Sequence, residues 1–177
     1  EYYNRQSSEE FDRLCHTLDN AKMIEVSSTT LPQRVLPKIM SDERYKAFLD
    51  ESNQAIKERS DLLEACFSGL PQIHFNKPNA AFYCTIVFKE GALQPGQHLK
   101  IQSPEIRKIL TEWLDSSDIS LDKRFVYYLL AAKGICVVPI SSFCSDLLGF
   151  RITLLEENRE IFKRTLKTLS DAIQEFC

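Results

Sequence analysis

The stretch KGICVVPISSFCSDLLGFRITLL, residues 133–155, carries the clearest information about the fold. Its first residues, Lys133 and Gly134, form a usual helix end and follow an apolar helical pattern over 120–132. Residues 135–139 are apolar and end in a Pro, which predicts a short buried strand. A Ser-rich loop follows, and residues 149–155 alternate as a second strand. Helices packed on a small sheet are therefore expected.

The segments on both sides of this stretch fit the same architecture. A long helix is predicted over 41–68, beginning at Ser41 and ending before Gly69, and a final helix over 156–176. Further helices are expected over 9–18, 33–40 and from residue 103, and strands over 72–75 and 81–88. The predicted fold class is α/β, in the form of an α+β sandwich with a small mixed β-sheet covered by helices.

Composition excludes several classes of function. The 177 residues include 22 basic and 25 acidic residues, so no basic footprint for nucleic acid is expected. The longest apolar run, 125–132, is far shorter than the roughly 18 to 20 residues that cross a bilayer. The six cysteines are scattered without a CxxC pair, which is typical of a reduced, cytoplasmic protein. Because the first residue is Glu, we expect the sequence to begin inside a longer chain.

Most catalytic patterns are missing from the sequence. His16, His74 and His98 lie far apart, and none stands at i, i+4 from another His or from a metal-type carboxylate pair, so no metal site is expected. A GxGxxG loop, a Walker loop and a GxSxG elbow are also missing, which disfavours a self-contained nucleotide site or a serine nucleophile.

Arg151 is the one residue of unusual placement. It lies within an alternating strand, where a guanidinium is uncommon unless it projects into a cleft or meets a carboxylate. One interpretation is an edge-strand Arg with a solvated head. The other is a fork for a planar carboxylate, because two parallel N–H groups match two oxygens in a way that Lys cannot.

Three segments carry a family resemblance: PNAAFY (78–83), KGICVVPISSF (133–143) and GFRI (149–152). In this order they resemble the C-terminal third of class I and II aminotransferases, which are fold-type I pyridoxal-phosphate enzymes. The resemblance covers roughly residues 25–177, and the long connection between the first two segments is similar to the alanine-aminotransferase-like branch. It implies that 1–40 connect from a large domain, and that 41–177 form the small C-terminal domain, including the long helix 41–68.

The resemblance also implies a function. Arg151 matches the arginine that receives the α-carboxylate of amino acid and 2-oxo acid substrates, in an enzyme that exchanges amino groups using pyridoxal 5'-phosphate. The lysine that binds this cofactor as a Schiff base belongs to the large domain and has no match here. We therefore expect no catalytic, cofactor-binding or metal-binding residue in this chain, no cofactor bound to it, and no activity by itself. The parent enzyme is expected to be a cytoplasmic homodimer that binds neither nucleic acid nor membrane.

The sequence departs from the family at three glycines, which are replaced by Ala80, Ile140 and Cys144. Such glycines commonly permit a positive φ or a close approach to a ligand. The replacements leave room for a different hypothesis, a non-catalytic regulatory or interaction module of aminotransferase-like fold. A third interpretation is an unrelated helix-on-sheet domain whose resemblance is accidental.

Overall fold

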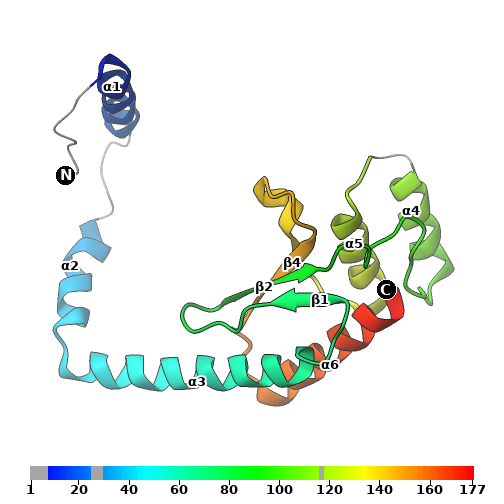
Figure 1. Ribbon diagram of the computed structural model, residues 1–177. Helices are drawn as coiled ribbons and strands as arrows, with labels where there is room; N and C mark the ends of the chain where they lie inside the picture. Colours follow the sequence, from blue (N-terminus) through cyan, green and yellow to red (C-terminus); the bar gives the residue numbers. More distant parts are fainter. Residues whose placement is uncertain (1–7, 25–29, 116–117) are drawn as a thin grey trace. The chain divides into compact units, whose positions relative to one another are not determined.

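The computed structural model describes residues 8–24, 30–115 and 118–177, and the chain divides into two compact units, 1–49 and 50–177. The first unit holds α1 (Glu9–Ile24), α2 (Thr30–Met40) and the start of α3 (Glu43–Phe67) (Figure 1). The domain boundary expected at residue 40 stays a prediction.

Polar side chains cap the N-terminal ends of α1 and α3. The Ser8 hydroxyl oxygen accepts a hydrogen bond from the Phe11 N–H at 3.2 Å, which starts α1. From the sequence, Ser7 and Glu10 are expected to form a capping box for this helix, but Ser7 lies outside the described residues. At α3 the cap is Asp42, whose carboxylate accepts from the Arg44 N–H at 2.9 Å, whereas the sequence had suggested Ser41.

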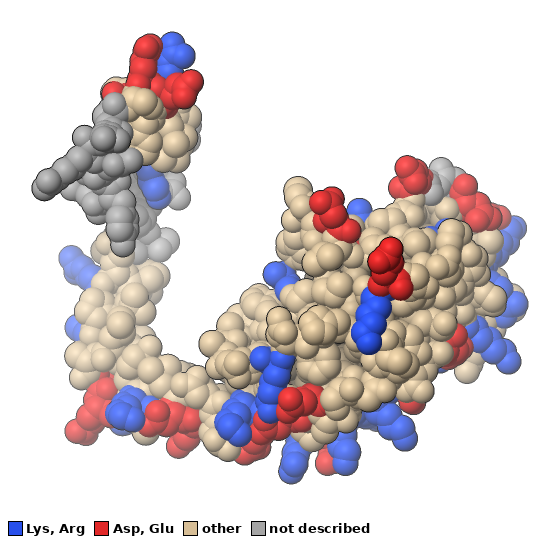
Figure 2. All heavy atoms as spheres, viewed as in Figure 1, with Lys and Arg blue, Asp and Glu red and all other residues tan. Residues whose placement is uncertain are grey.

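Helix α3 is buried only towards its C-terminal end. Ser60, Leu63 and Phe67 are buried, whereas Phe48 is 61% exposed. Charged side chains of both signs follow the helix (Figure 2). The long helix predicted over 41–68 is therefore present, but it has buried residues only in its last turns, which belong to the second unit.

The second unit is built on a four-stranded sheet with strand order β1-β2-β4-β3. The strands are β1 (Ile73–Phe75), β2 (Tyr83–Phe88), β3 (Val138–Pro139) and β4 (Gly149–Thr153). All three pairings are antiparallel. The α+β class is confirmed, and the sheet differs from the expected mixed one because its strands all pair with antiparallel neighbours.

Three helices complete the second unit: α4 (Pro104–Asp115), α5 (Leu121–Lys133) and α6 (Arg159–Phe176). The core centres on Phe125 of α5, whose ring lies 5.0 Å from Phe88, 5.4 Å from Phe150 and 5.1 Å from Phe176, between centroids. Edge and tilted contacts of this kind add to the burial of large apolar rings. Helices α5 and α6 therefore cover one face of the sheet and leave the other face open. Within the described ranges, no helix is both long and apolar enough to span a membrane.

The segment after α5 is less regular than the sequence predicted. Gly134 ends α5 in the left-handed conformation, with φ of 70°. The strand expected over 135–139 pairs with β4 only at Val138 and Pro139. The expected Ser-rich loop is a 3-10 helix, η1 (Ile140–Phe143).

Candidate functional site

The open face of the sheet displays Arg151 on its third strand in spatial order. Arg151 pairs with Thr85 of β2 on one side and with Val138 of β3 on the other. Because side chains alternate along a strand, the neighbouring Phe150 points into the core, where it is fully buried. Arg151 is half-buried and belongs to the opposite, open face.

Two aromatic rings flank the Arg151 guanidinium. Its central carbon lies 4.5 Å from the centroid of the Tyr83 ring and 4.4 Å from that of Phe143. A guanidinium over an aromatic face at this distance gains a cation–π interaction, and the rings restrict its orientation. The three residues come from β2, η1 and β4, so the arrangement exists only in the folded sheet.

The polar groups of Arg151 are left available. Among the residues that the structure describes, Arg151 has no carboxylate and no hydrogen-bond acceptor as partner. A guanidinium carries five N–H donors in a planar fork, which matches a carboxylate in a bidentate pair. The site is therefore suited to a planar anion that arrives from the open face.

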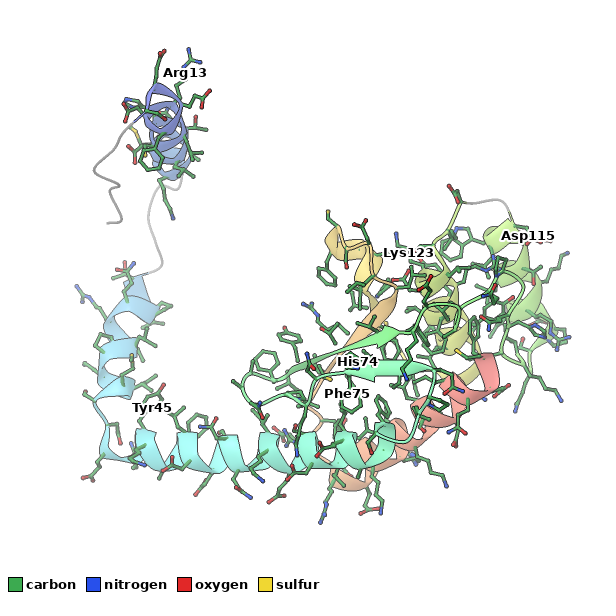
Figure 3. All side chains as sticks on the ribbon, in the orientation of Figure 1. Arg13, Tyr45, His74, Phe75, Asp115 and Lys123 are labelled. Carbon is green, nitrogen blue, oxygen red and sulfur yellow. The ribbon has the colours of Figure 1, made fainter. Side chains whose placement is uncertain are left out.

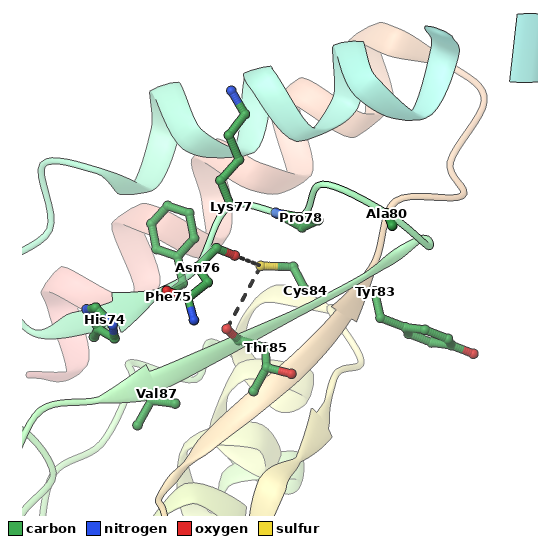
Figure 4. Close-up of a pocket in the computed structure, with 10 residues that line it drawn as sticks. All are labelled: His74, Phe75, Asn76, Lys77, Pro78, Ala80, Tyr83, Cys84, Thr85 and Val87. Carbon is green, nitrogen blue, oxygen red and sulfur yellow. Dashed lines mark hydrogen bonds between the residues drawn. The ribbon is translucent and has the colours of Figure 1, made fainter. Parts of the chain in front are cut away.

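A cavity of about 350 Å³ lies beside Tyr83, where the β1–β2 connection opens (Figure 4). His74 of β1 and Thr85 of β2 line it on the sheet side, and Lys77 and Ala80 line it from the connecting loop. His74 is exposed on the short first strand (Figure 3). Tyr83 thus borders both this cavity and Arg151.

Cys84, which also lines this cavity, is buried. Burial raises the pKa of Cys84 to about 11, which keeps the thiol protonated at neutral pH. Its sulfur lies 3.9 Å from the backbone oxygen of Asn76. The cavity can hold a ligand but supplies no activated sulfur.

A larger cavity of about 780 Å³ lies between the C-terminal part of α3 and the loop 77–82. Its charged residues are paired with one another. The Lys77 ammonium lies 2.7 Å from Asp61 and 2.6 Å from Glu64, and Lys57 lies 3.1 Å from Asp61. The hydrogen bonds to Asp61 and Glu64 raise the pKa of Lys77.

The lysines of this chain do not fit a Schiff-base site for pyridoxal phosphate. Such a lysine must lose its proton, which burial away from carboxylates favours. Lys77 has the opposite environment, and Lys133 is bonded to Glu175 at 2.7 Å. None of the described lysines is buried. These lysines therefore lack the environment that a Schiff-base partner of the cofactor needs.

The three positions at which this sequence replaces a family glycine differ in backbone conformation and packing. Cys144, directly after η1, takes a left-handed conformation with φ of 56°, which L-residues rarely adopt. Ala80 does not, but its neighbour Ala81 does, with φ of 59°. Ile140 is buried beside Gly149, where an added Cβ would lie 2.6 Å from the Ile140 Cδ1 atom. The loop conformation that a glycine would permit after η1 is thus present with a cysteine.

Sequence reasoning found Arg151 but missed its surroundings. Tyr83 and Phe143 each end one of the segments that resemble aminotransferases, yet nothing in their spacing shows that both rings meet one guanidinium. Asp122 was also missed, because an acidic residue in a first helical turn normally indicates only a favourable helix dipole. In the structure its side chain is fully buried.

Comparisons with known proteins show the family of this chain. The family model of aminotransferase class I and II matches residues 7–165. An uncharacterised aminotransferase of Methanocaldococcus jannaschii is 43% identical over 176 residues, which are 99% of this chain and 40% of that protein. The chain thus spans about 40% of the length of the relative that it matches. With most of the sequence matched by the family model, the chain belongs to the class I and II aminotransferases.

Proposed function

We propose that this chain forms the carboxylate-binding part of a pyridoxal-phosphate-dependent aminotransferase, and that Arg151 binds the α-carboxylate of its amino acid and 2-oxo acid substrates. One observation carries this proposal. Arg151 stands on the open face of the sheet between two aromatic rings, with its N–H donors unpaired among the described residues.

The physical reason is positioning. A strand with partners on both sides holds the Arg151 backbone, and the rings of Tyr83 and Phe143 limit the rotation of its side chain. A bidentate pair with the substrate carboxylate then fixes the reacting end of the substrate before the chemical step. Prior positioning of this kind removes much of the entropic barrier.

We propose that the exchange of the amino group depends on parts of the full-length protein other than this chain. The family implies pyridoxal phosphate in the full-length protein, where it supplies the exchange of the amino group. We propose that this chain without the rest of the protein is inactive, because its lysines do not fit the cofactor site. The homodimer, the location in the cytoplasm and the alanine-aminotransferase-like branch stay predictions from the sequence.

The test uses the full-length protein with the variants Arg151→Ala and Arg151→Lys. Removal of one partner of a desolvated charge pair costs about 2–5 kcal/mol, so we expect kcat/KM to fall on the order of 100-fold in Arg151→Ala. Most of this change should appear as a higher KM for both the amino acid and the 2-oxo acid. Arg151→Lys should recover only part of it, because an ammonium cannot form the planar bidentate pair.

The matched control is Arg164→Ala, which removes an exposed arginine from α6 and should leave KM unchanged. Thermal unfolding of each variant shows whether the protein is folded. A folded Arg151→Ala variant with the KM of the parent protein for both substrates would refute the assignment of Arg151.

A further inference from the structure

A fully buried carboxylate, Asp122, lies in the first turn of α5. Its Oδ1 atom accepts hydrogen bonds from the Ser120 hydroxyl at 2.7 Å, the Lys123 N–H at 2.8 Å and the Ser141 hydroxyl at 2.8 Å. Its Oδ2 atom accepts from the Ser141 N–H at 2.9 Å. We call Ser120, Asp122 and Ser141 the Asp122 cluster.

The Asp122 cluster joins two segments that are separate in the sequence. Ser120 and Lys123 belong to the start of α5, and their bonds to Asp122 are local. Ser141 belongs to η1, and it contributes both its backbone N–H and its hydroxyl. Two charge-assisted bonds to one residue fix both its position and its orientation. The carboxylate therefore holds η1 against the end of α5.

A stabilising role alone is a weak explanation for such a group. Burial of a charge is costly, and apolar side chains of similar volume often replace a buried polar group without loss of stability. Buried polar groups are better attested as devices that select one arrangement of the chain. Here the arrangement selected is the placement of η1.

The residue placed by η1 is Phe143, which lies over the Arg151 guanidinium at 4.4 Å. Phe143 is 49% exposed, so core packing does not hold its ring. The preceding strand β3 pairs with β4 over only two residues, and Cys144 after η1 has an unfavourable left-handed backbone. Besides the buried Ile140 at its start, η1 is therefore restrained by the bonds to Ser141, two residues before Phe143.

We propose that Asp122 is a positioning residue for substrate binding: through Ser141 it fixes η1 so that Phe143 stays over Arg151 and the guanidinium remains oriented towards the substrate carboxylate. This inference rests on the proposed function of Arg151. Asp122 does not touch the substrate, and it acts only through η1 and Phe143.

The matched variants are Ser141→Ala and Ser142→Ala in the full-length protein. Both serines belong to η1, but the Ser141 hydroxyl donates to Asp122, whereas Ser142 is exposed. A cation–π contact changes affinity by about 2- to 30-fold. We expect Ser141→Ala to raise KM for both substrates by about threefold, with little change in kcat, and Ser142→Ala to leave KM within twofold.

A second set of variants tests the route of action. Asp122→Asn and Phe143→Ala should each raise KM by about tenfold. Because both substitutions act on the same contact, Asp122→Asn should raise KM less than twofold when Phe143 is already Ala. Amide hydrogen exchange over 140–144 should become faster in Asp122→Asn, and thermal unfolding reports whether each variant is folded.

The outcomes separate this inference from the proposed function. If Arg151→Ala raises KM while Ser141→Ala and Ser142→Ala have equal effects, the inference is wrong and the role of Arg151 stands. If the increases in KM caused by Asp122→Asn and Phe143→Ala multiply fully in the double variant, the inference is also wrong. An unchanged KM in Arg151→Ala would remove the proposed function itself. If Asp122→Asn does not fold, the comparison of the two serine variants decides.

Discussion

At the scale of single residues, the role proposed for Arg151 depends on the side chains around it. In the sequence it is one of ten arginines. Its position in a strand was compatible with a guanidinium exposed to solvent and with one that binds a carboxylate. The structure places the rings of Tyr83 and Phe143 beside it. Those contacts favour the fork, because a freely solvated arginine would not need two aromatic partners.

Cys144 is a second residue whose environment leads to a prediction. A left-handed backbone costs an L-residue roughly 1–2 kcal/mol, whereas glycine takes it without steric cost but loses more entropy on folding. We expect Cys144→Gly to raise the free energy of unfolding by about 0.5–1 kcal/mol. Urea denaturation with an unchanged m-value would measure this gain.

The control for Cys144→Gly is Cys136→Gly, at an exposed cysteine that has no positive φ. There glycine relieves no strain and should lower stability. Equal effects of the two substitutions would show that the left-handed conformation of Cys144 carries no strain.

At the scale of elements, apolar periodicity predicted the helices better than the strands. In α6 the spaced residues Phe162, Leu166, Leu169, Ile173 and Phe176 are all buried, as expected. In α4 the periodicity placed Ile106, Ile109, Leu110 and Trp113 on one side. Leu110 is buried, whereas Ile106, Ile109 and Trp113 are 46%, 68% and 43% exposed, although the Trp113 ring lies 4.3 Å from that of Tyr127 in α5. The face of α4 that packs is set by its contact with α5, where Leu110 and Leu114 are buried.

Helix α6 also has a cap whose removal is testable. The Asn158 side-chain oxygen accepts from the Glu160 N–H at 3.1 Å and the Ile161 N–H at 3.0 Å. We expect Asn158→Ala to lower the free energy of unfolding by about 1 kcal/mol, because two backbone donors lose their partner. Asn158→Asp keeps an acceptor at the same place and should stay close to the parent protein. Chemical denaturation of the three proteins compares them, and equal losses in both variants would refute the capping role.

At the scale of the whole molecule, the chain combines a sheet-based unit with a helical N-terminal unit. The family match extends over both, from residue 7 to 165, whereas the resemblance seen in the sequence began near residue 25. The helices of the first unit expose many apolar side chains, among them Leu31, Leu36 and Met40. Composition counts these apolar residues but does not show whether they are buried. It therefore did not distinguish this unit from an ordinary globular domain.

The stability of the protein should depend on pH in the alkaline range. Burial raises the pKa of Cys84 to about 11 from its ordinary value of 9.0. Between these values the unfolded thiol loses its proton while the folded one keeps it, so the free energy of unfolding falls as pH rises. Below the ordinary value both states are protonated, and the full contribution is present.

We therefore expect a fall in stability between about pH 9 and pH 11 that is smaller in Cys84→Ala. Denaturation under reducing conditions at several pH values measures it. Cys136→Ala, at an exposed position, should keep the pH dependence of the parent protein. An identical alkaline fall in the parent protein and in Cys84→Ala would contradict the buried, protonated state of this thiol.

The sequence by itself determined the helices, the two central strands, the α+β class and the family, because these depend on periodicity, turn residues and short local motifs. It also singled out Arg151 by its unusual place in a strand. Only the tertiary structure decided which groups surround that arginine. Tyr83, Phe143 and the Asp122 cluster come from separate elements, and their contacts arise when the antiparallel pairing of β2, β4 and β3 and the packing of η1 on α5 bring them together. No local pattern encodes such distances, since they depend on packing between segments far apart in the chain.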